Sequence, residues 1–409
     1  MFSMRKGLLV VVIANSGNFA GYLFQLLAAH KMSPPDYGIF NALNSLIVLL
    51  SSPLPVLNLF VAKLIIKALE IDGAVKFLWK TLLKYSGVLS LTALCIGSLF
   101  IPLIVGYFHL SRKFYAFLAV LQISLVFILP SLSGTLQGLG YYVALATLMA
   151  LFHWGRLATG AGFSVHGLTI TEALLSGIVG AVAAIIWGLF ISSKALPPAK
   201  NVSFRFFDLV KKESFGSLPF LALNYFIVSL FLNIDLMLVR HYLPPEEVGF
   251  YAAAAILGRI SFYLVGILGA VVFAETVRHQ GARSTLKLIL LACIVSFGYS
   301  IVCGIWPEGI IKLLLGAKYV HSAPILRILA LGMSFLSLAS LFFARLLGEE
   351  RYGFLWGALF CILLTTGAVV FKWHRSGTEI AFWVLIGTFF SFLWVVWFWL
   401  RGGAKCSLS

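Results

Sequence analysis

The sequence predicts an all-α, polytopic membrane protein with about twelve transmembrane helices in two six-helix lobes. Composition is the first observation: 61% of the 409 residues are hydrophobic, and only 11% are charged. The mean hydropathy is +1.02. A soluble chain of this length cannot bury so much apolar surface, so lipid must solvate its helices. The other two observations are the lengths of the apolar stretches and an internal repeat.

The apolar stretches have the length that a bilayer requires. A hydrocarbon core of about 30 Å is crossed by about 20 helical residues. In the first half of the chain, six such stretches lie near Gly7–Ala29, Tyr37–Ala62, Tyr85–Tyr107, Phe114–Ser133, Gly140–Gly162 and Leu168–Ile191. In the second half, six more lie near Phe215–Val239, Val248–Ala274, Leu288–Ile305, Ala323–Leu346, Gly353–Phe371 and Ile380–Leu400.

Two of these stretches need comment. The first follows Arg5 and Lys6, as a signal peptide would, but it is too long and lacks a small-residue cleavage site, so we keep it as a span. The second contains Pro53 and Pro55, which remove helix hydrogen bonds and predict a bend.

A basic segment divides the two sets of helices. It runs from Ser192 to Glu213 and contains Pro197 and Pro198, which break a helix. No loop is long enough to form a folded domain outside the membrane. The predicted organisation is an N-terminal lobe over residues 1–192, a cytoplasmic linker over 193–214 and a C-terminal lobe over 215–409.

One motif, His-x-x-x-Pro-x-Acid-x-Gly-x-Aromatic-x-Ala, occurs once in each half. A shift of 211 residues places the copy over His30–Ala42 on the copy over His241–Ala253. A second echo, one residue out of step, pairs 59–63 with 271–275. Recurrence at one spacing favours an internal duplication. Each half starts in the same direction, so the two lobes would be related by an axis along the membrane normal.

The distribution of cations predicts the orientation. With the N-terminus inside, the inner segments hold 19 Lys and Arg and the outer segments hold 9. We expect the protein in the cytoplasmic membrane. Because translocation disfavours cations, we expect both termini on the cytoplasmic side. The net charge of +16 is spread over these loops, which fits anionic lipids as partners and not nucleic acid. The five cysteines show no metal-ligand spacing, and we expect no metal or cofactor.

Several motifs carry a resemblance to a known family. They are the two hairpins at His30–Ala42 and Arg240–Ala254, Asn233-x-Asp235, the Gly-x-x-Tyr segment from Gly316 to Arg327, and the segment from Leu136 to Tyr142. Together they resemble polysaccharide exporters of the O-antigen flippase type, in the multidrug/oligosaccharidyl-lipid/polysaccharide (MOP) superfamily. One departure is His30-Lys31, where many relatives carry Arg, which puts a substrate contact at that position in doubt.

The resemblance implies two MATE-like six-helix lobes around a central cavity. It also implies a secondary transporter, not an enzyme, that moves a polyprenyl-pyrophosphate-linked oligosaccharide from the inner to the outer leaflet by alternating access. The implied partners are the lipid-linked glycan and the glycan polymerase or assembly machinery. The alternatives are a multidrug or cation antiporter of the same superfamily and a membrane enzyme of glycan assembly.

Ionisable residues inside the spans are the candidate site residues, because a charge at the bilayer centre costs at least about 2.5 kcal/mol. Arg259 lies in the middle of the eighth span, and Arg156 lies in the fifth, one turn from His153. A guanidinium offers planar donors to phosphate oxygens, so these cations could line a pyrophosphate site. The other interpretation of Arg259 is an ion pair with Asp235, which lies within reach of it in depth.

Asp235 itself is a candidate for coupling transport to H⁺ or Na⁺, or for that ion pair. Asn18, Gln25 and Asn44 are polar residues of the first two spans. They either line the cavity or form interhelical hydrogen bonds.

The chain lacks a phosphate-cradling Gly-x-x-x-x-Gly-Lys motif, which argues against a built-in ATPase. It also lacks the His-Glu-x-x-His pattern and a large outer loop with paired acids, which argues against an enzyme that transfers sugars.

Overall fold

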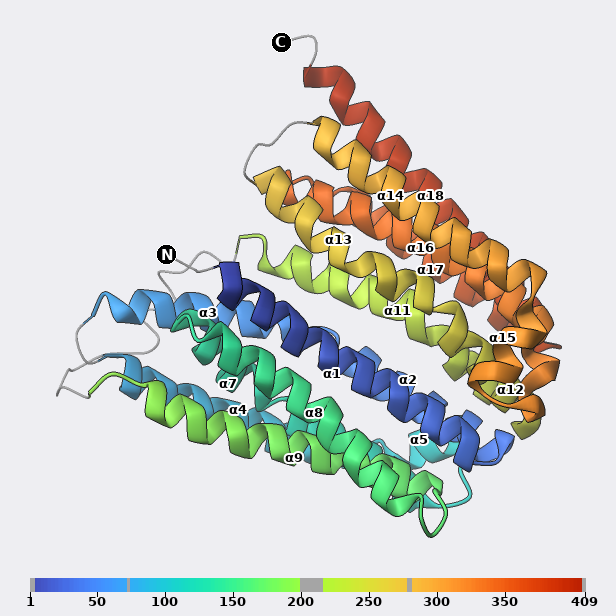
Figure 1. Ribbon diagram of the computed structural model, residues 1–409, viewed down its shortest axis with the longest axis horizontal. Helices are drawn as coiled ribbons and strands as arrows, with labels where there is room; N and C mark the ends of the chain where they lie inside the picture. The colour runs from blue at the N-terminus through green and yellow to red at the C-terminus, as the bar shows by residue number, and fades with distance from the viewer. Residues whose placement is uncertain (1–3, 72–73, 199–215, 278–281, 407–409) are drawn as a thin grey trace. The chain divides into compact units, whose positions relative to one another are not determined.

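The computed structural model describes residues 4–71, 74–198, 216–277 and 282–406. Every regular element in these ranges is a helix (Figure 1). This confirms the predicted all-α class. Most of the predicted linker, 193–214, lies outside the described residues, although the last helix before it continues to Ala195.

The chain forms two compact units. Unit 1 comprises Met1–Met32 and Leu50–Pro219. Its helices are α1 (Met4–Lys31), α3 (Leu54–Leu69), α4 (Ala74–Leu99), α5 (Ile101–Tyr107), α6 (Lys113–Val126), α7 (Leu129–Gly138), α8 (Tyr142–Phe163) and α9 (Ile170–Ala195).

Unit 2 comprises Ser33–Leu49 and Phe220–Ser409. Its helices are α2 (Pro34–Ser51), α11 (Leu218–Tyr242), α12 (Pro245–Gly258), α13 (Ile260–Val277), α14 (Ala282–Ile305), α15 (Pro307–Leu314), the 3₁₀ helix η1 (Ala317–Ser322), α16 (Ala323–Gly348), α17 (Phe354–Phe371) and α18 (Gly377–Cys406). The start of the second span thus packs with the second half of the chain. The lobe boundaries at 192 and 215 stay a prediction, because compact units are not the same as sequence repeats.

Corresponding helix pairs pack together in the two units. In unit 1, α3 packs on α7, α4 on α6, α6 on α9, and α8 on α9. In unit 2, α13 packs on α16, α14 on α16, α16 on α18, and α17 on α18. These are the same pairs when the spans of each half are counted in order, which is the pattern expected of a duplicated six-helix unit.

Four of the predicted spans are interrupted by a short break. The breaks separate α2 from α3, α4 from α5, α6 from α7, and α12 from α13. Pro53, Pro102 and Pro130 lie at the first three breaks, where proline lacks the amide that a continuous helix would use. The bend predicted at Pro53 is confirmed. The fourth break has no proline, and Arg259 stands there as the residue between the two helices.

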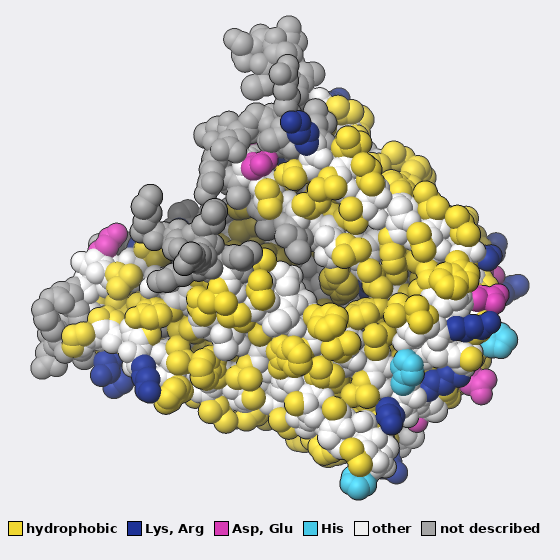
Figure 2. Space-filling model, in the orientation of Figure 1, with side chains coloured by type: hydrophobic (Ala, Val, Ile, Leu, Met, Phe, Trp, Pro, Cys, Tyr) yellow, Lys and Arg dark blue, Asp and Glu magenta, His cyan; other side chains and the backbone are white. Residues whose placement is uncertain are grey.

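The chain is a multi-pass membrane protein. Eleven of the described helical segments are long and apolar enough to cross a bilayer. Figure 2 shows apolar side chains along the middle of the helices and most charged side chains near their ends. The remaining span-length helix is α8, which carries His153 and Arg156 and is not among these eleven segments.

The repeated hairpin motif is a packing motif within unit 2. Gly38 of the first copy faces Gly249 of the second, and a β carbon on Gly38 would lie 2.7 Å from the Gly249 amide nitrogen. A β carbon on Gly249 would overlap the Pro34 carbonyl. Tyr37 packs on Tyr319 with ring centroids 5.6 Å apart. The glycines are required because the two helix starts touch through their backbones.

Candidate functional site

Helices α1 and α8 of unit 1 run in the same direction and pack closely. A β carbon on Gly17 would lie 2.7 Å from the α carbon of Ala150, and one on Gly21 would lie 2.8 Å from Nδ1 of His153. Small residues at such contacts let two helix backbones approach in a membrane. Four predicted site residues are on these helices: Asn18 and Gln25 on α1, and His153 and Arg156 on α8.

Arg156 is held against an aromatic ring of α1. Its guanidinium carbon lies 4.3 Å from the centroid of the Phe24 ring, and the residue is only 7% exposed. The Phe24 ring also packs on Gly160, where a β carbon would overlap it. A desolvated cation over an aromatic face gains about 2 kcal/mol. The ring therefore fixes the position of a positive charge inside a membrane-spanning segment.

Oε1 of Gln25 and Nδ1 of His153 are buried polar atoms on these helices without a hydrogen-bond partner among the described residues. His153 lies one turn from Arg156 on α8, and Gln25 lies one turn along α1 from Gly21, which touches His153. Buried polar atoms in proteins normally have a partner, so these two indicate a place for water or a ligand. The cluster can donate charge-assisted hydrogen bonds to an anion.

A second polar cluster lies within unit 2, where α11 meets the break between α12 and α13. Nη2 of Arg259 lies 2.9 Å from Oδ1 of Asp235. The hydroxyl of Tyr251 donates to Oδ2 at 3.1 Å, and the amide of Leu236 donates to Oδ1 at 2.8 Å. Asp235 and Tyr251 are fully buried, and Arg259 is 8% exposed.

The structure therefore contains the ion pair that was one of the two interpretations of Asp235. Both carboxylate oxygens have donors, which offsets the cost of burying the charge. Arg259 starts from the helix break, so its side chain can reach back to α11. Nε of Arg259 is buried without a hydrogen-bond partner among the described residues. A substrate contact by Arg259, and ion coupling by Asp235, stay predictions.

The remaining predicted site residues are less closely placed. Asn18 is exposed on α1, and Asn44 is part-buried on the section of α2 that belongs to unit 2. Unit 1 therefore holds four of the six predicted substrate residues, and unit 2 holds Asn44 and Arg259. Within unit 1, the packing joins His153 to α1 beside Gln25 and joins Arg156 to Phe24.

Three buried residues of these helices were not selected as site residues from the sequence. Phe24 carries no charge, so nothing in the sequence indicated that its ring would contact the Arg156 guanidinium. Tyr251 was present only as the aromatic position of the repeated motif. Arg240 was assigned to an outer loop, but α11 continues to Tyr242 and leaves Arg240 only 5% exposed. The helix continues because the first proline after it is Pro244.

Solved structures with a similar fold are membrane transporters. The lipid II flippase MurJ in an inward closed conformation matches with a TM-score of 0.73 at 14% identity, over 95% of this chain and 87% of that protein. An inward-facing multidrug resistance MATE family transporter of the MOP superfamily matches with a TM-score of 0.73 at 13% identity, over 98% of this chain and 99% of that one. The chain has the same fold as MurJ and this MATE transporter.

A third match shows how varied the binding pockets of this fold are. A MOP superfamily transporter from Pyrococcus furiosus, described as having a binding pocket of reverse polarity that suggests a different function, matches with a TM-score of 0.58 at 13% identity, over 97% of this chain and 93% of that one. No protein-family model and no curated protein matches the sequence. At these identities the likeness concerns the fold, and substrate must be argued from residues. In the part of the chain that the structure describes, no group of His, Cys, Asp and Glu side chains could hold a metal ion.

Proposed function

We propose that this protein is a secondary transporter that flips a polyprenyl-pyrophosphate-linked oligosaccharide from the inner to the outer leaflet of the cytoplasmic membrane. The observation that carries the proposal is Arg156, a buried guanidinium positioned by Phe24 inside a membrane-spanning helix. Such a charge is expensive in hydrocarbon and indicates function. Its planar donors suit the oxygens of a pyrophosphate.

The neighbouring groups support an amphipathic, anionic substrate. The partnerless Gln25 Oε1 and His153 Nδ1 can bond sugar hydroxyls or water around the head group. The fold is compatible with this activity, since one protein that shares it is described as a lipid II flippase. A substrate can shift a transporter between two states only if it binds them with different affinity. Arg156 would supply that difference by binding the pyrophosphate in the inward state.

A multidrug exporter is the second candidate, because MATE transporters match the fold equally well. A cationic drug would be repelled by Arg156. The positive charge of this cluster therefore favours the lipid-linked glycan.

The test is flipping by the full-length protein in proteoliposomes. A fluorescent, polyprenyl-pyrophosphate-linked oligosaccharide is incorporated, and the exposure of its sugar is followed with an impermeant glycosidase. Arg156→Gln should lower the flipping rate about tenfold or more, as expected from the loss of hydrogen bonds to a charged group. Arg156→Lys should retain an intermediate rate, because it keeps the charge but loses the planar donors.

Arg112→Gln is the matched control, since Arg112 is an exposed arginine in the loop before α6. It should flip at the wild-type rate. Equal flipping by wild type and Arg156→Gln would refute the role of Arg156. Efflux of a cationic dye without any flipping of the glycan would instead establish the multidrug exporter.

A further inference from the structure

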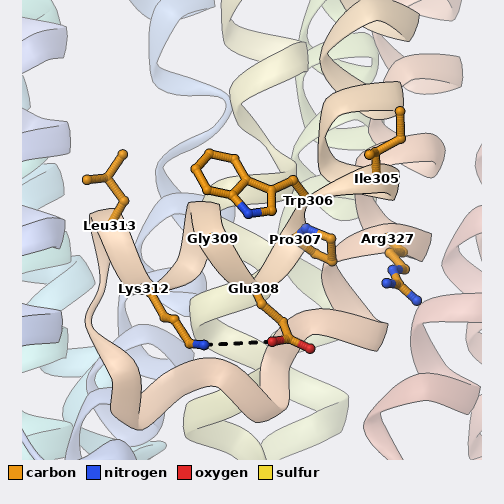
Figure 3. Close-up of a pocket in the computed structure, with 8 residues that line it drawn as sticks. All are labelled: Ile305, Trp306, Pro307, Glu308, Gly309, Lys312, Leu313 and Arg327. Carbon is orange, nitrogen blue, oxygen red and sulfur yellow. Dashed lines mark ion pairs between the residues drawn. The ribbon is translucent and has the colours of Figure 1, made fainter.

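A pocket opens at the end of α14, beside the short helix α15 and the start of α16 (Figure 3). Its volume is about 590 Å³, and all of its lining belongs to unit 2. The lining residues are Ile305, Trp306, Pro307, Glu308, Gly309, Lys312, Leu313 and Arg327. It is separate from both polar clusters described above.

The pocket carries two cations and one carboxylate. Figure 3 shows Glu308 between Lys312 and Arg327 in this view. Nζ of Lys312 lies 3.8 Å from Oε2 of Glu308, with both side chains more than half exposed. Such a long, exposed pair adds little stability, so it opens easily for a ligand. Arg327 is exposed and makes no hydrogen bond or ion pair among the described residues. The pocket therefore offers a net charge of +1 and an available guanidinium.

An apolar stripe leads along α14 to this pocket. Leu290, Ile294, Ile301 and Ile305 lie on one face of the helix and are 60–78% exposed. Leu290 and Ile305 are separated by about 22 Å at 1.5 Å per residue, which exceeds half of a hydrocarbon core of about 30 Å. The stripe is thus long enough for an acyl chain in one leaflet.

Aromatic and amphipathic residues mark the level of the membrane interface at the end of the stripe. Trp306 is 60% exposed and Leu313 is 75% exposed, on either side of the charged residues of α15. Trp is enriched at the head-group level. A lysine beside apolar residues can keep its stem in lipid and its ammonium among head groups.

The corresponding helix of unit 1 lacks these features. Helix α5 also follows a proline-marked break and also precedes the fourth span of its half, but its sequence from Ile101 to Tyr107 contains no charged residue. The charges around α15 are therefore not required to make the break or the short helix.

We propose that this pocket binds one anionic glycerophospholipid from the surrounding bilayer. Its phosphodiester contacts Arg327 and Lys312, and one acyl chain lies on the α14 stripe. The charge of −1 on the phosphodiester balances the +1 of the pocket. A soluble phosphate could use the two cations but has no use for the stripe, so the lipid fits the whole site better.

The test is native mass spectrometry of the full-length, delipidated protein with phosphatidylglycerol. Arg327→Gln should weaken the tightest phosphatidylglycerol adduct about tenfold or more, as expected from the loss of hydrogen bonds to a charged group. Glu308→Gln should strengthen it several-fold, because it removes the repelling charge and releases Lys312. General destabilisation of the protein would not produce opposite effects at two residues of the same pocket. Arg112→Gln, an exposed arginine outside the pocket, should leave the affinity unchanged.

Two further ligands distinguish an anionic phospholipid from other ligands that could occupy the pocket. Phosphatidylethanolamine should bind more weakly than phosphatidylglycerol, and inorganic phosphate at the same concentration should not displace the lipid. The proposal is wrong if Arg327→Gln binds phosphatidylglycerol like wild type, if Arg112→Gln weakens it equally, or if phosphate displaces the lipid. It is also wrong if phosphatidylethanolamine binds equally well. Thermal unfolding without lipid verifies that each variant is folded.

Discussion

Asp235 shows how a single residue can have a structural role at a place where the sequence also suggests chemistry. Its two oxygens receive bonds from Arg259, Tyr251 and the Leu236 amide. Burial makes such a carboxylate costly unless every oxygen has a donor. The ion pair was one of two possibilities at the level of sequence, since depth alone brought Asp235 and Arg259 within reach. The hydrogen bond from Tyr251 to Asp235 was found only in the structure.

Breaking the pair from one side should destabilise the protein strongly. Asp235→Asn leaves Arg259 buried without its counter-ion and should lower the free energy of unfolding by about 3–5 kcal/mol. The double variant Asp235→Asn with Arg259→Gln should recover much of this loss, because neither charge remains. Thermal unfolding in detergent measures both.

Tyr251→Phe is the milder companion variant. It removes one hydrogen bond to the carboxylate and should cost about 1.5 kcal/mol. A coupling role for Asp235 would give a different result: Asp235→Asn would remain stable but lose the dependence of transport on an ion gradient.

At the scale of elements, the repeated motif acts through backbone contact. The six matched positions lie at the end of one helix and in the first turns of the next, and the contact of Gly38 with Gly249 became visible only in the structure. The sequence predicted the helices on either side of each hairpin and the bend at Pro53. It did not predict that α2 would pack with the second half of the chain. Periodicity describes one helix at a time and carries no information on which helix it meets.

Gly249→Ala should destabilise the packing of α2 on α12. The new methyl group would overlap the Pro34 carbonyl, and backbone cannot move aside as a flexible side chain can. Overpacking of this kind costs about 1–3 kcal/mol, which thermal unfolding in detergent detects. Gly298→Ala is the control, because a β carbon at Gly298 on α14 meets nothing within 4 Å. Equal unfolding temperatures for wild type and Gly249→Ala would contradict the contact.

At the scale of the whole molecule, the cation distribution and the helix count together predict the orientation. Nineteen Lys and Arg in inner segments against nine in outer ones predict that both termini lie in the cytoplasm. Eleven of the twelve predicted spans correspond to described helical segments that are long and apolar enough to cross a bilayer, and corresponding helix pairs recur in the two units. Which face of the membrane each loop occupies stays a prediction.

Cysteine labelling tests the orientation. In a variant without the native cysteines, Ser111→Cys should react with an impermeant maleimide in intact cells, because the loop after α5 is predicted outside. Glu70→Cys, after α3, should react only once the membrane is permeabilised. Both residues are exposed in the structure, so access is limited by the bilayer alone. The reverse labelling pattern would invert the topology.

The sequence by itself determined the membrane class, the all-α fold, the approximate positions of the spans and the break at Pro53. These follow from hydropathy, length and turn residues, which act locally along the chain. The tertiary structure decided which polar groups meet: Arg156 on Phe24, His153 at Gly21, and Asp235 with both Arg259 and Tyr251. Those contacts depend on how each helix is rotated about its axis and which neighbour it packs against, and both are settled by the packing of all the helices of a unit together.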